Sequence, residues 1–385
     1  MKILFYAWNI YDENLPEMQI APNGGSIAIR NIAEYVGRKC DVYLFLGKRK
    51  MPEKRLHHIN IVNTEKYPDC VDEGIDKNEC WLRTMLHAFE ETIKELHPDF
   101  VNLHGGGELL KRAIIKCKEM NVKYAYTNHL YIGLEKEIEG YHDSVEMEKE
   151  LFSIPDVMVT TVGTKSKENI LRDYPCMSEK NIDVILNGTD FQYENVNSSL
   201  VKKYNLQGKK VLLCIGSIIK RKNQLQVVQA FAEMKKEERD KIAILFCGND
   251  KMNGALQREI EKYDLQNNLI YLGIIPNDEM KKYYSIADGY ILISLAEGLS
   301  LTMLEAMVFG LPLIMFDDVE GASDLADDKV TLFIHGKENK DIIDAILKWK
   351  DTDWDKNYIQ EYAKYFNLER VADDYIAYYK KRLSE

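Results

Sequence analysis

Two glutamates, Glu297 and Glu305, bracket the run EGLSLTMLE and are the strongest chemical signal in the chain. The apolar stretch Tyr290–Leu295 predicts a buried strand with Glu297 at its carboxyl end, where open α/β sheets bind ligands. Leu301–Phe309 predicts a short helix, and Glu305 falls on its inward seam, four residues after Leu301. Because an unpaired buried charge is costly, we expect Glu305 to have a partner.

The turn between the glutamates belongs to the same signal. Gly298, Leu299 and Ser300 lead into the helix, where free backbone N–H groups form a natural anion site. Two carboxylate acceptors beside a phosphate-sized donor site suit a ligand with hydroxyl and phosphate groups, such as a nucleotide sugar. The plain alternative is that Glu297 is an ordinary helix-start carboxylate and Glu305 pairs with a nearby Lys or Arg.

A basic loop offers a second phosphate site. The cations Lys220–Lys222 follow the predicted strand Val211–Ile215 and precede the predicted helix Gln224–Met234, for which Asn223 and Gln226 make a capping box. Three cations that face a helix N-terminus are placed to bind a diphosphate. The alternative is a solvated basic loop without a ligand.

Paired glycines in the N-terminal half form a third candidate. Gly24 and Gly25 follow the first predicted strand and precede the amphipathic helix Ile27–Val36. At a helix start they let backbone N–H groups approach a phosphate or sugar closely, whereas the alternative is a turn with Ser26 as N-cap. The dinucleotide fingerprint GxGxxG is absent here, which counts against a nicotinamide enzyme.

Two histidines stand at predicted strand ends. His104 follows Phe100–Leu103, and His129 comes just after Tyr124–Thr127. There each can donate to a substrate hydroxyl or phosphate, although a lone histidine is more often structural. No spacing among His, Cys and carboxylates resembles a metal site, so we expect no metal and no cofactor.

Composition sets the outer limits. The chain has 385 residues, 45% hydrophobic and 29% charged, which is enough for two domains with substantial cores. Its net charge of -11 argues against a nucleic-acid binder. Seven scattered cysteines without a CxxC pair, an N-terminus that reads as a strand and no apolar run long enough to span a bilayer predict a cytoplasmic protein. Peripheral contact with the inner face of a membrane and the oligomeric state are left open.

The elements that position these residues alternate in both halves. Apolar runs separated by helical stretches predict parallel sheets covered on both faces. The expected strands are Ile3–Ala7, Val42–Leu46, Ile59–Val62, Phe100–Leu103, Tyr124–Thr127, Val157–Thr160 and Asp183–Leu186, then Val211–Ile215, Ile242–Cys247, Leu269–Leu272, Gly289–Leu295, Leu313–Phe316 and Val330–Ile334. The polar stretch Asn187–Ser199 predicts a linker, so the domains are expected at 1–187 and 188–359. The last helical segment, about 360–385, either caps the second domain or packs back on the first.

In order along the chain, these motifs resemble the GT-B glycosyltransferases, in particular the retaining family 4 group (glycosyl transferases group 1). The matching segments cover nearly the whole chain: NGGS, VNLHGGG, YTNH, ILNGTD, CIGSIIKRKNQ, LFCGND, YLG and AEGLSLTMLEAMVFGLPLI. The last is similar to the family's E-x7-E signature, with Glu297 and Glu305 as its acids. The resemblance implies an α/β protein with two Rossmann-like domains whose parallel sheets face a central cleft.

The resemblance also assigns roles. Glu305 would accept hydrogen bonds from the ribose, while His129 and Glu297 would be the catalytic residues near the transferred sugar. The donor-binding set would be Gly24, Gly25, Ser217, Arg221, Lys222, Gly248, Ile274, Gly298, Leu299, Ser300, Leu301 and Glu305, with His104 and Asn187 as further cleft residues. Ser217 departs from the family, which has Arg there. Either Arg221 replaces that arginine or Lys222 alone holds the diphosphate.

We therefore predict a retaining hexosyltransferase-type enzyme. It would move a sugar from a nucleotide-diphosphate sugar, with UDP as the expected nucleotide, to a glycan, lipid-linked or small-molecule acceptor. The acceptor pocket is expected in the N-terminal loops Tyr11–Gln19, Met51–Asp76 and Leu130–Tyr141. The alternatives are a non-catalytic GT-B partner subunit and a nucleotide-sugar epimerase or hydrolase on the same fold.

Overall fold

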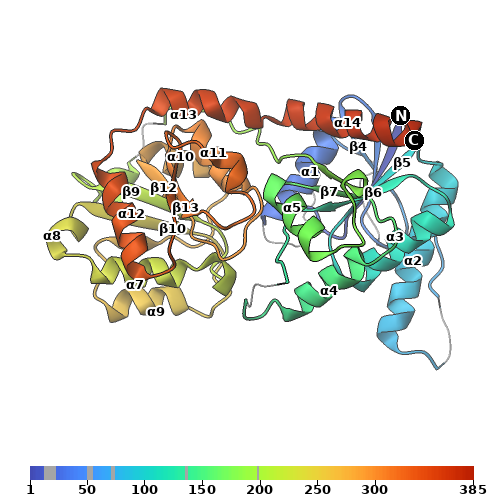
Figure 1. Cartoon of the computed structure of the whole chain (residues 1–385), viewed down its shortest axis with the longest axis horizontal. Coiled ribbons are helices and arrows are strands. Elements are labelled where there is room, and N and C mark those ends of the chain that lie inside the picture. The colour runs from blue at the N-terminus through green and yellow to red at the C-terminus, as the bar shows by residue number, and fades with distance from the viewer. Residues whose placement is uncertain (13–22, 50–54, 71–73, 135–137, 197–198) are drawn as a thin grey trace.

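The computed structural model contains two lobes that lie side by side (Figure 1). It describes residues 1–12, 23–49, 55–70, 74–134, 138–196 and 199–385. Each lobe is built on one sheet. The strands of the first sheet run in the order β3-β4-β2-β1-β5-β6-β7-β8, and those of the second in the order β11-β10-β9-β12-β13-β14.

The first sheet is parallel apart from its edge pair β3 and β4, which is antiparallel. Its strands are β1 (Lys2–Tyr6), β2 (Asp41–Phe45), β3 (Arg55–Leu56), β4 (Ile59–Ile61), β5 (Phe100–His104), β6 (Tyr124–Asn128), β7 (Val159–Thr161) and β8 (Ile182–Val184). The associated helices are α1 (Gly24–Gly37), α2 (Lys77–Leu96), α3 (Gly107–Glu119), α4 (His142–Phe152), α5 (Thr164–Asp173) and the 3-10 turn η2 (Glu179–Asn181).

Both faces of this sheet are buried, as its continuous apolar strands predict. On β1, Ile3 and Phe5 pack into a core shared with α1, whereas Leu4 and Tyr6 pack into a core shared with α2 and α3. The alternation follows from the two-residue period of a strand. The first lobe therefore has one apolar core on each side of its sheet.

The second sheet has parallel pairs throughout its described ladder. Its strands are β9 (Lys210–Ile215), β10 (Ile242–Cys247), β11 (Leu269–Tyr271), β12 (Gly289–Ile291), β13 (Leu313–Phe316) and β14 (Thr331–Ile334). Its helices are α6 (Leu200–Lys203), η3 (Lys220–Lys222), α7 (Gln224–Glu233), α8 (Lys236–Arg239), α9 (Ala255–Lys262), α10 (Met280–Ile286), α11 (Leu301–Val308), η4 (Ser323–Leu325) and α12 (Asn339–Asp351).

The chain ends with α13 (Lys356–Ala363), η5 (Lys364–Phe366) and α14 (Leu368–Ser384), which run along one side of both lobes (Figure 1). Helix α13 packs on α11, and α14 packs on α1. Tyr375 and Tyr379 of α14 are buried in the first lobe, where Asn102 Nδ2 donates to Tyr379 Oη at 2.8 Å. The sequence left open whether this segment caps the second domain or packs back on the first, and α14 packs on the first lobe. The boundary at residue 187 stays a prediction.

Three local expectations are wrong. Asn23, and not Ser26, is the N-cap of α1, because its Oδ1 accepts from the Ser26 amide at 3.0 Å. The capping box of α7 does not form, since the side-chain Nδ2 of Asn223 donates to Gln226 Oε1 at 2.6 Å and neither side chain caps a backbone amide. Strand β12 ends at Ile291, short of Leu295, whose amide donates to the Arg221 carbonyl at 2.8 Å.

Candidate functional site

The two lobes meet at the loop that carries Glu297. A Cβ at Gly298 would lie 2.5 Å from the carbonyl oxygen of His129, so the approach of this loop to the first lobe requires a glycine. One residue further on, the Leu299 carbonyl accepts from Asn187 Nδ2 at 2.8 Å. The structure therefore brings four predicted site residues, His129, Asn187, Gly298 and Leu299, to one seam between the lobes.

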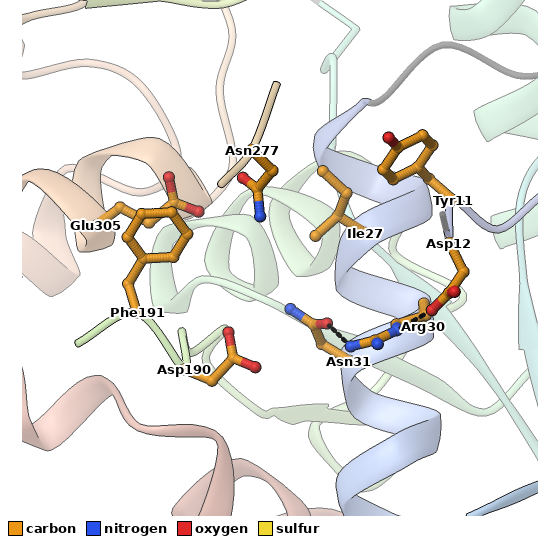
Figure 2. Close-up of a pocket in the computed structure, with 9 residues that line it drawn as sticks. All are labelled: Tyr11, Asp12, Ile27, Arg30, Asn31, Asp190, Phe191, Asn277 and Glu305. Atoms are coloured by element: carbon orange, nitrogen blue, oxygen red, sulfur yellow. Dashed lines mark hydrogen bonds and ion pairs between the residues drawn. The ribbon is translucent and has the colours of Figure 1, made fainter. Parts of the chain in front are cut away.

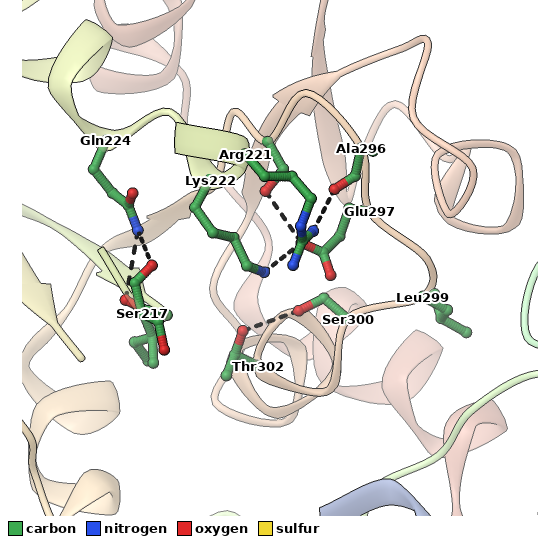
Figure 3. Close-up of polar contacts among 12 residues, drawn as sticks. Ser217, Arg221, Lys222, Gln224, Ala296, Glu297, Leu299, Ser300 and Thr302 are labelled. Carbon is green, nitrogen blue, oxygen red and sulfur yellow. Dashed lines mark hydrogen bonds and ion pairs between the residues drawn. The ribbon is translucent and has the colours of Figure 1, made fainter. Parts of the chain in front are cut away.

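Glu297 lies in a cluster of charges that comes from two loops of the second lobe (Figure 3). Its Oε2 pairs with Lys222 Nζ, lies 3.2 Å from Arg221 Nη1 and accepts from Ser294 Oγ at 3.1 Å. All three charged side chains are at least 87% buried, with 13% of Glu297, 12% of Lys222 and 11% of Arg221 exposed. The basic loop is therefore not a solvated surface loop.

The pKa values of the pair reflect this enclosure. Burial alone would raise the pKa of Glu297, but the charges of Lys222 and Arg221 outweigh it and lower that pKa below its usual range. Burial lowers the pKa of Lys222, and the Glu297 carboxylate opposes that shift. We therefore take Glu297 as ionised at neutral pH, with two cations sharing one carboxylate. One positive charge of the cluster is left over for an anionic ligand.

Arg221 also reaches the first lobe. Its Nη1 donates to the Ala296 carbonyl, and its Nε lies 3.2 Å from the Tyr141 hydroxyl. Nearby, Ile132 and Ile138 pack with Ala296 in a small apolar cluster that spans the two lobes. Arg221 thus fastens the loop before α4 to the loop that carries Glu297.

Glu305 is hydrogen-bonded to a tyrosine and not to the Lys or Arg that the alternative reading of the sequence predicted. It is 9% exposed on α11, and its Oε2 accepts from Tyr284 Oη at 2.7 Å. Among the described residues, no Lys or Arg forms a salt bridge with it, so that alternative is wrong. It is also wrong for Glu297, which precedes the N-cap Ser300 and lies outside the first turn of α11. Burial raises the pKa of Glu305 to about 7.

Glu305 opens onto a pocket between the lobes (Figure 2). The pocket has a volume of about 240 Å³ and is lined by Tyr11, Asp12, Ile27, Arg30, Asn31, Asp190, Phe191, Asn277 and Glu305. Figure 2 shows the side chains of α1 on one side and Glu305 with Phe191 on the other. A ligand in this pocket touches both lobes.

Sequence reasoning missed the α1 wall of this pocket. Asn31 is polar but only 7% exposed, because it lies on the buried face of α1 next to Ile32. Arg30 pairs with Asp12 at 2.8 Å and donates to Asn31 Oδ1 at 3.0 Å. A buried amide among the apolar positions of a helix was the available signal, because such a group needs polar partners.

The start of α11 offers backbone donors beside Glu297. The backbone amide of Met303 donates to the Ser300 carbonyl at 3.2 Å, and it is the first amide after Glu297 that has an acceptor in the described part of the chain. The N–H groups of Gly298 to Leu301 have no acceptor there, as the predicted anion site requires. Across the seam, a Cβ at Gly24 would meet nothing within 4 Å, and one at Gly25 only Asn23 Oδ1 at 3.6 Å. Packing in the described structure therefore does not explain either glycine.

The two candidate histidines form a pair. His104 Nδ1 lies 2.9 Å from His129 Nε2, with the ring planes inclined by 25°. His104 is fully buried, and His129 is partly exposed. Burial, followed by the neighbouring His129, holds the pKa of His104 well below its usual value, and burial lowers the pKa of His129 to about 4. Both rings are therefore neutral at neutral pH.

The remaining candidates lie in three loops of the second lobe. The Ser217 carbonyl accepts from Gln224 Nε2 at 3.0 Å, which ties the loop after β9 to α7. A Cβ at Gly248 would lie 2.1 Å from the Gly216 carbonyl oxygen, so this glycine is required where two loops touch. Ile274 is 53% exposed and does not line the pocket, which Asn277 reaches instead.

Parts of the expected acceptor loops, residues 13–19, 51–54, 71–73 and 135–137, lie outside the described residues. Over the described ranges, no group of three or more His, Cys, Asp or Glu side chains could hold a metal ion. None of the described helices is both long and apolar enough to cross a bilayer.

Comparison with known proteins decides the family. Residues 197–366 match the sequence profile described as "Glycosyl transferases group 1". The C-terminal lobe belongs to this family. One relative of this chain is the alpha-monoglucosyldiacylglycerol synthase of Streptococcus pneumoniae, 31% identical over 154 residues. That alignment covers 38% of this chain and 34% of the relative, so the chain spans about a third of the relative's length.

Solved structures show the GT-B fold over the whole chain. Sucrose-phosphate synthase from Thermosynechococcus elongatus superimposes with a TM-score of 0.77 at 15% identity, covering 100% of this chain and 99% of that one. Anabaena HepE, solved in complex with UDP and glucose, gives a TM-score of 0.73 at 16% identity and covers 99% and 100%. The predicted match to group 1 is confirmed over residues 197–366, and the predicted α/β architecture of two Rossmann-like domains is confirmed over the whole chain.

Proposed function

We propose that the protein transfers a hexose from a UDP-sugar to a hydroxyl group of a glycan or lipid-linked acceptor, with retention of configuration at the anomeric carbon. The observation that carries this proposal is the arrangement of its two signature carboxylates. Glu305 opens onto a pocket lined by both lobes, and Glu297 is held beside two buried cations at the start of α11. Together they offer a hydroxyl acceptor next to a site for a diphosphate.

In this proposal the nucleoside occupies the pocket, where Glu305 accepts from the ribose hydroxyls. The diphosphate lies between Lys222, Arg221 and the free N–H groups of Gly298 to Leu301. These positive groups stabilise the charge that builds up on the departing phosphate, and this electrostatic role needs no metal ion. Gly24 and Gly25 approach the diphosphate from the other lobe.

The transferred sugar lies between Glu297 and His129. Glu297 is engaged by two cations, so it is not poised as a free nucleophile, and we assign it to orienting those cations and stabilising positive charge at the anomeric carbon. The acceptor oxygen bonds to the anomeric carbon on the face that the diphosphate leaves, the bond from that carbon to the diphosphate breaks, and the acceptor proton passes to the departing phosphate. Positioning and electrostatics then carry the reaction without a covalent intermediate on the protein. Arg221 takes the place of the arginine that the family has at Ser217.

The acceptor is proposed from the first lobe and from the relatives. The pneumococcal relative is a synthase of a glucosylated diacylglycerol. The loop before α4 packs on Ala296 and contacts Arg221, so in this proposal an acceptor bound there reaches the sugar. We therefore place the acceptor hydroxyl against this loop of the first lobe.

Thermal unfolding with UDP, GDP and UDP-glucose, each with and without EDTA, tests donor binding. A ligand at 100 times its Kd stabilises the protein by about 2.7 kcal/mol, so binding is readily visible. We expect UDP and UDP-glucose to stabilise the protein equally well with EDTA. Loss of the shift in EDTA, or no shift with any nucleotide, contradicts the proposed donor site.

Two variants and one product analysis complete this test. Lys222→Ala and Arg221→Ala should weaken UDP much more than uridine, because both cations face the diphosphate. An Arg221→Ala that binds UDP normally would mean that Lys222 acts alone. NMR of the product made from α-linked UDP-glucose should show an α-glycoside, whereas a β-glycoside contradicts retention. Release of free glucose with every acceptor tried would favour the hydrolase alternative.

A further inference from the structure

The α1 wall of the pocket carries a buried amide group with a fixed orientation. Asn31 is only 7% exposed, and its Oδ1 accepts from Arg30 Nη1 at 3.0 Å. A guanidinium group has donors only, so the amide atom that faces Arg30 must be the oxygen. The Asn31 nitrogen Nδ2 therefore points away from Arg30, and Figure 2 shows it directed into the space between α1 and the wall that carries Glu305.

Arg30 is itself held in place from the other side. Its Nε donates to Asp12 Oδ2 at 2.8 Å, and the Asp12 side chain is only 2% exposed. Separating a buried ion pair is costly, so the Arg30 guanidinium keeps its position and leaves Asn31 one orientation. Asp12, Arg30 and Asn31 thus form a chain of contacts that ends in an NH₂ group facing the pocket.

This NH₂ group is not used within the protein. Asn31 Nδ2 has two N–H donors, and neither finds an acceptor among the described residues. A purely structural role for Asn31 explains its oxygen, which Arg30 needs, but leaves two enclosed donors without partners, which is costly. A ligand that accepts from Asn31 in the pocket explains both ends of the amide.

The wall across the pocket offers acceptors instead. Glu305 and Asp190 both line it. Burial raises the pKa of Glu305 to about 7 and the Asp190 charge acts in the same direction, so the two carboxylates lie close enough to interact. A ligand group between the walls must accept from Asn31 and donate to a carboxylate. A hydroxyl group does both, whereas a phosphate or carbonyl oxygen only accepts and an ammonium group only donates.

We infer that Asn31 is a further nucleotide-binding residue, which donates to a ribose hydroxyl oxygen while the ribose donates to Glu305, and that Asp12 and Arg30 position its amide. This inference rests on the proposed function, which places the nucleoside in the pocket. The ribose is then bound by both lobes at once. Its hydroxyl groups therefore select ribonucleotides over their deoxy forms through contacts on two walls.

Calorimetry of the intact protein with UDP and with 2′,3′-dideoxy-UDP tests the contact. Asn31→Leu keeps the approximate size of the side chain but removes both N–H groups, so the Kd for UDP should rise by about threefold to tenfold. The dideoxy ligand has no hydroxyl for Asn31 to meet, so its Kd should change by less than about twofold. Asn31→Ala should give the same pattern. Asn78→Ala, at an exposed asparagine of α2, is the matched control and should change neither Kd.

Variants of Arg30 test its positioning role. Arg30→Met keeps the apolar stem but no longer donates to Asn31, so the preference for UDP over the dideoxy ligand should fall as it does in Asn31→Leu. This ratio cancels the general effect of a lost charge on the diphosphate. Arg30→Lys keeps a cationic donor and should restore the preference to within about twofold of the wild type. Combining Arg30→Met with Asn31→Leu should reduce the preference no further, because both act on one contact.

The outcomes separate this inference from the proposed function. Thermal unfolding without ligand shows which variants fold, and either Asn31 variant that folds decides the contact. If UDP and the dideoxy ligand weaken equally, or if UDP binding is unchanged, Asn31 does not bind the ribose and the inference alone is wrong. An unaltered preference in Arg30→Met excludes Arg30 as the positioning residue. A wild type that binds neither ligand contradicts the proposed donor site, and this inference with it.

Discussion

The two ends of the segment from Glu297 to Glu305 show how differently one fold can treat the same side chain. At the first end, Glu297 is buried against Lys222 and Arg221, and its pKa is lowered despite the burial. At the other end, Glu305 is equally enclosed, but among the described residues the Tyr284 hydroxyl is its only partner, and burial raises its pKa to about 7. Glu297 is therefore satisfied within the protein, whereas Glu305 still lacks the partners that an ionised buried carboxylate requires.

Because the two glutamates differ in pairing, we expect Glu297 to contribute mainly to the stability of the fold and Glu305 mainly to ligand binding. A buried carboxylate that is fully paired contributes mainly to the folded state, because removing it strands its cations. One that is underpaired is held ready for a ligand, because ligand hydroxyl groups can supply the missing hydrogen bonds. We therefore expect Glu297 and Glu305 to respond in opposite ways to the same substitution.

The largest expected effect is that of Glu297→Gln on stability. Removing one partner of a buried ion pair costs about 3–5 kcal/mol, so the variant should unfold at a markedly lower temperature. Within the described part of the chain, Glu305→Gln removes no salt bridge, so this variant should unfold within about 1 kcal/mol of the wild type. Thermal and urea unfolding of both variants measure this. Equal destabilisation by the two substitutions would remove the basis of the comparison.

Glu305→Gln should instead weaken donor binding. A hydrogen bond to a charged group contributes about 1.5–3 kcal/mol, so the Kd for UDP should rise by roughly tenfold to a hundredfold. Uridine, which carries the same ribose, should weaken by the same factor. Calorimetry of the wild type, Glu305→Gln and the surface control Glu261→Gln checks this. A UDP affinity that Glu305→Gln leaves intact would exclude Glu305 from the ribose site.

The dependence on pH should follow the two acids in separate windows. The folded-state pKa of Glu305 is raised to about 7, so the folded protein binds the extra proton as pH falls from about 8, and stability should rise. The same proton removes the charged acceptor, so UDP affinity should fall over that range. Glu297, whose pKa is lowered, should lose its stabilising contribution only in more acidic solution.

Comparison with Glu305→Gln isolates this effect. Glu148, which accepts from the amides of Ile132 and Gly133, also has a pKa raised to about 7 by burial and contributes in the same direction. Only the part of the pH dependence that disappears in Glu305→Gln belongs to Glu305. A variant with the same pH profile as the wild type for both stability and UDP affinity would contradict the assignment.

The smallest expected effect concerns the contact between the lobes at the paired end. Tyr141→Phe removes the hydroxyl that Arg221 Nε approaches at 3.2 Å, and one such hydrogen bond contributes about 0.5–1.5 kcal/mol. Because Arg221 keeps Glu297, UDP affinity should change by no more than about threefold, whereas the KM for the acceptor should rise. Steady-state kinetics with both substrates varied measure this. If only the KM for the donor changes, Tyr141 does not contribute to binding of the acceptor.

Much of this molecule was determined by the sequence itself. Apolar runs of four to six residues followed by glycine and amphipathic helices predict parallel strands, and the predicted strand positions coincide with those observed to within a few residues. Both acids were also recognisable as candidates: Glu305 because a carboxylate on the inward seam of a helix breaks the apolar pattern, and Glu297 because it follows a buried strand. Each of these patterns lies within a short run of consecutive residues, so it can be recognised without knowledge of the tertiary structure.

Only the tertiary structure decided which partner each acid receives. Lys222 is 75 positions from Glu297, and Tyr284 is 21 positions from Glu305, so neither pairing follows from local spacing. The pairing of His104 with His129, the wall that α1 adds to the pocket and the return of α14 to the first lobe likewise depend on strand order and lobe packing. The sequence placed two acids at the two ends of one short segment, and the long-range contacts of the fold put one of them into an ion-pair cluster and the other on the wall of a pocket.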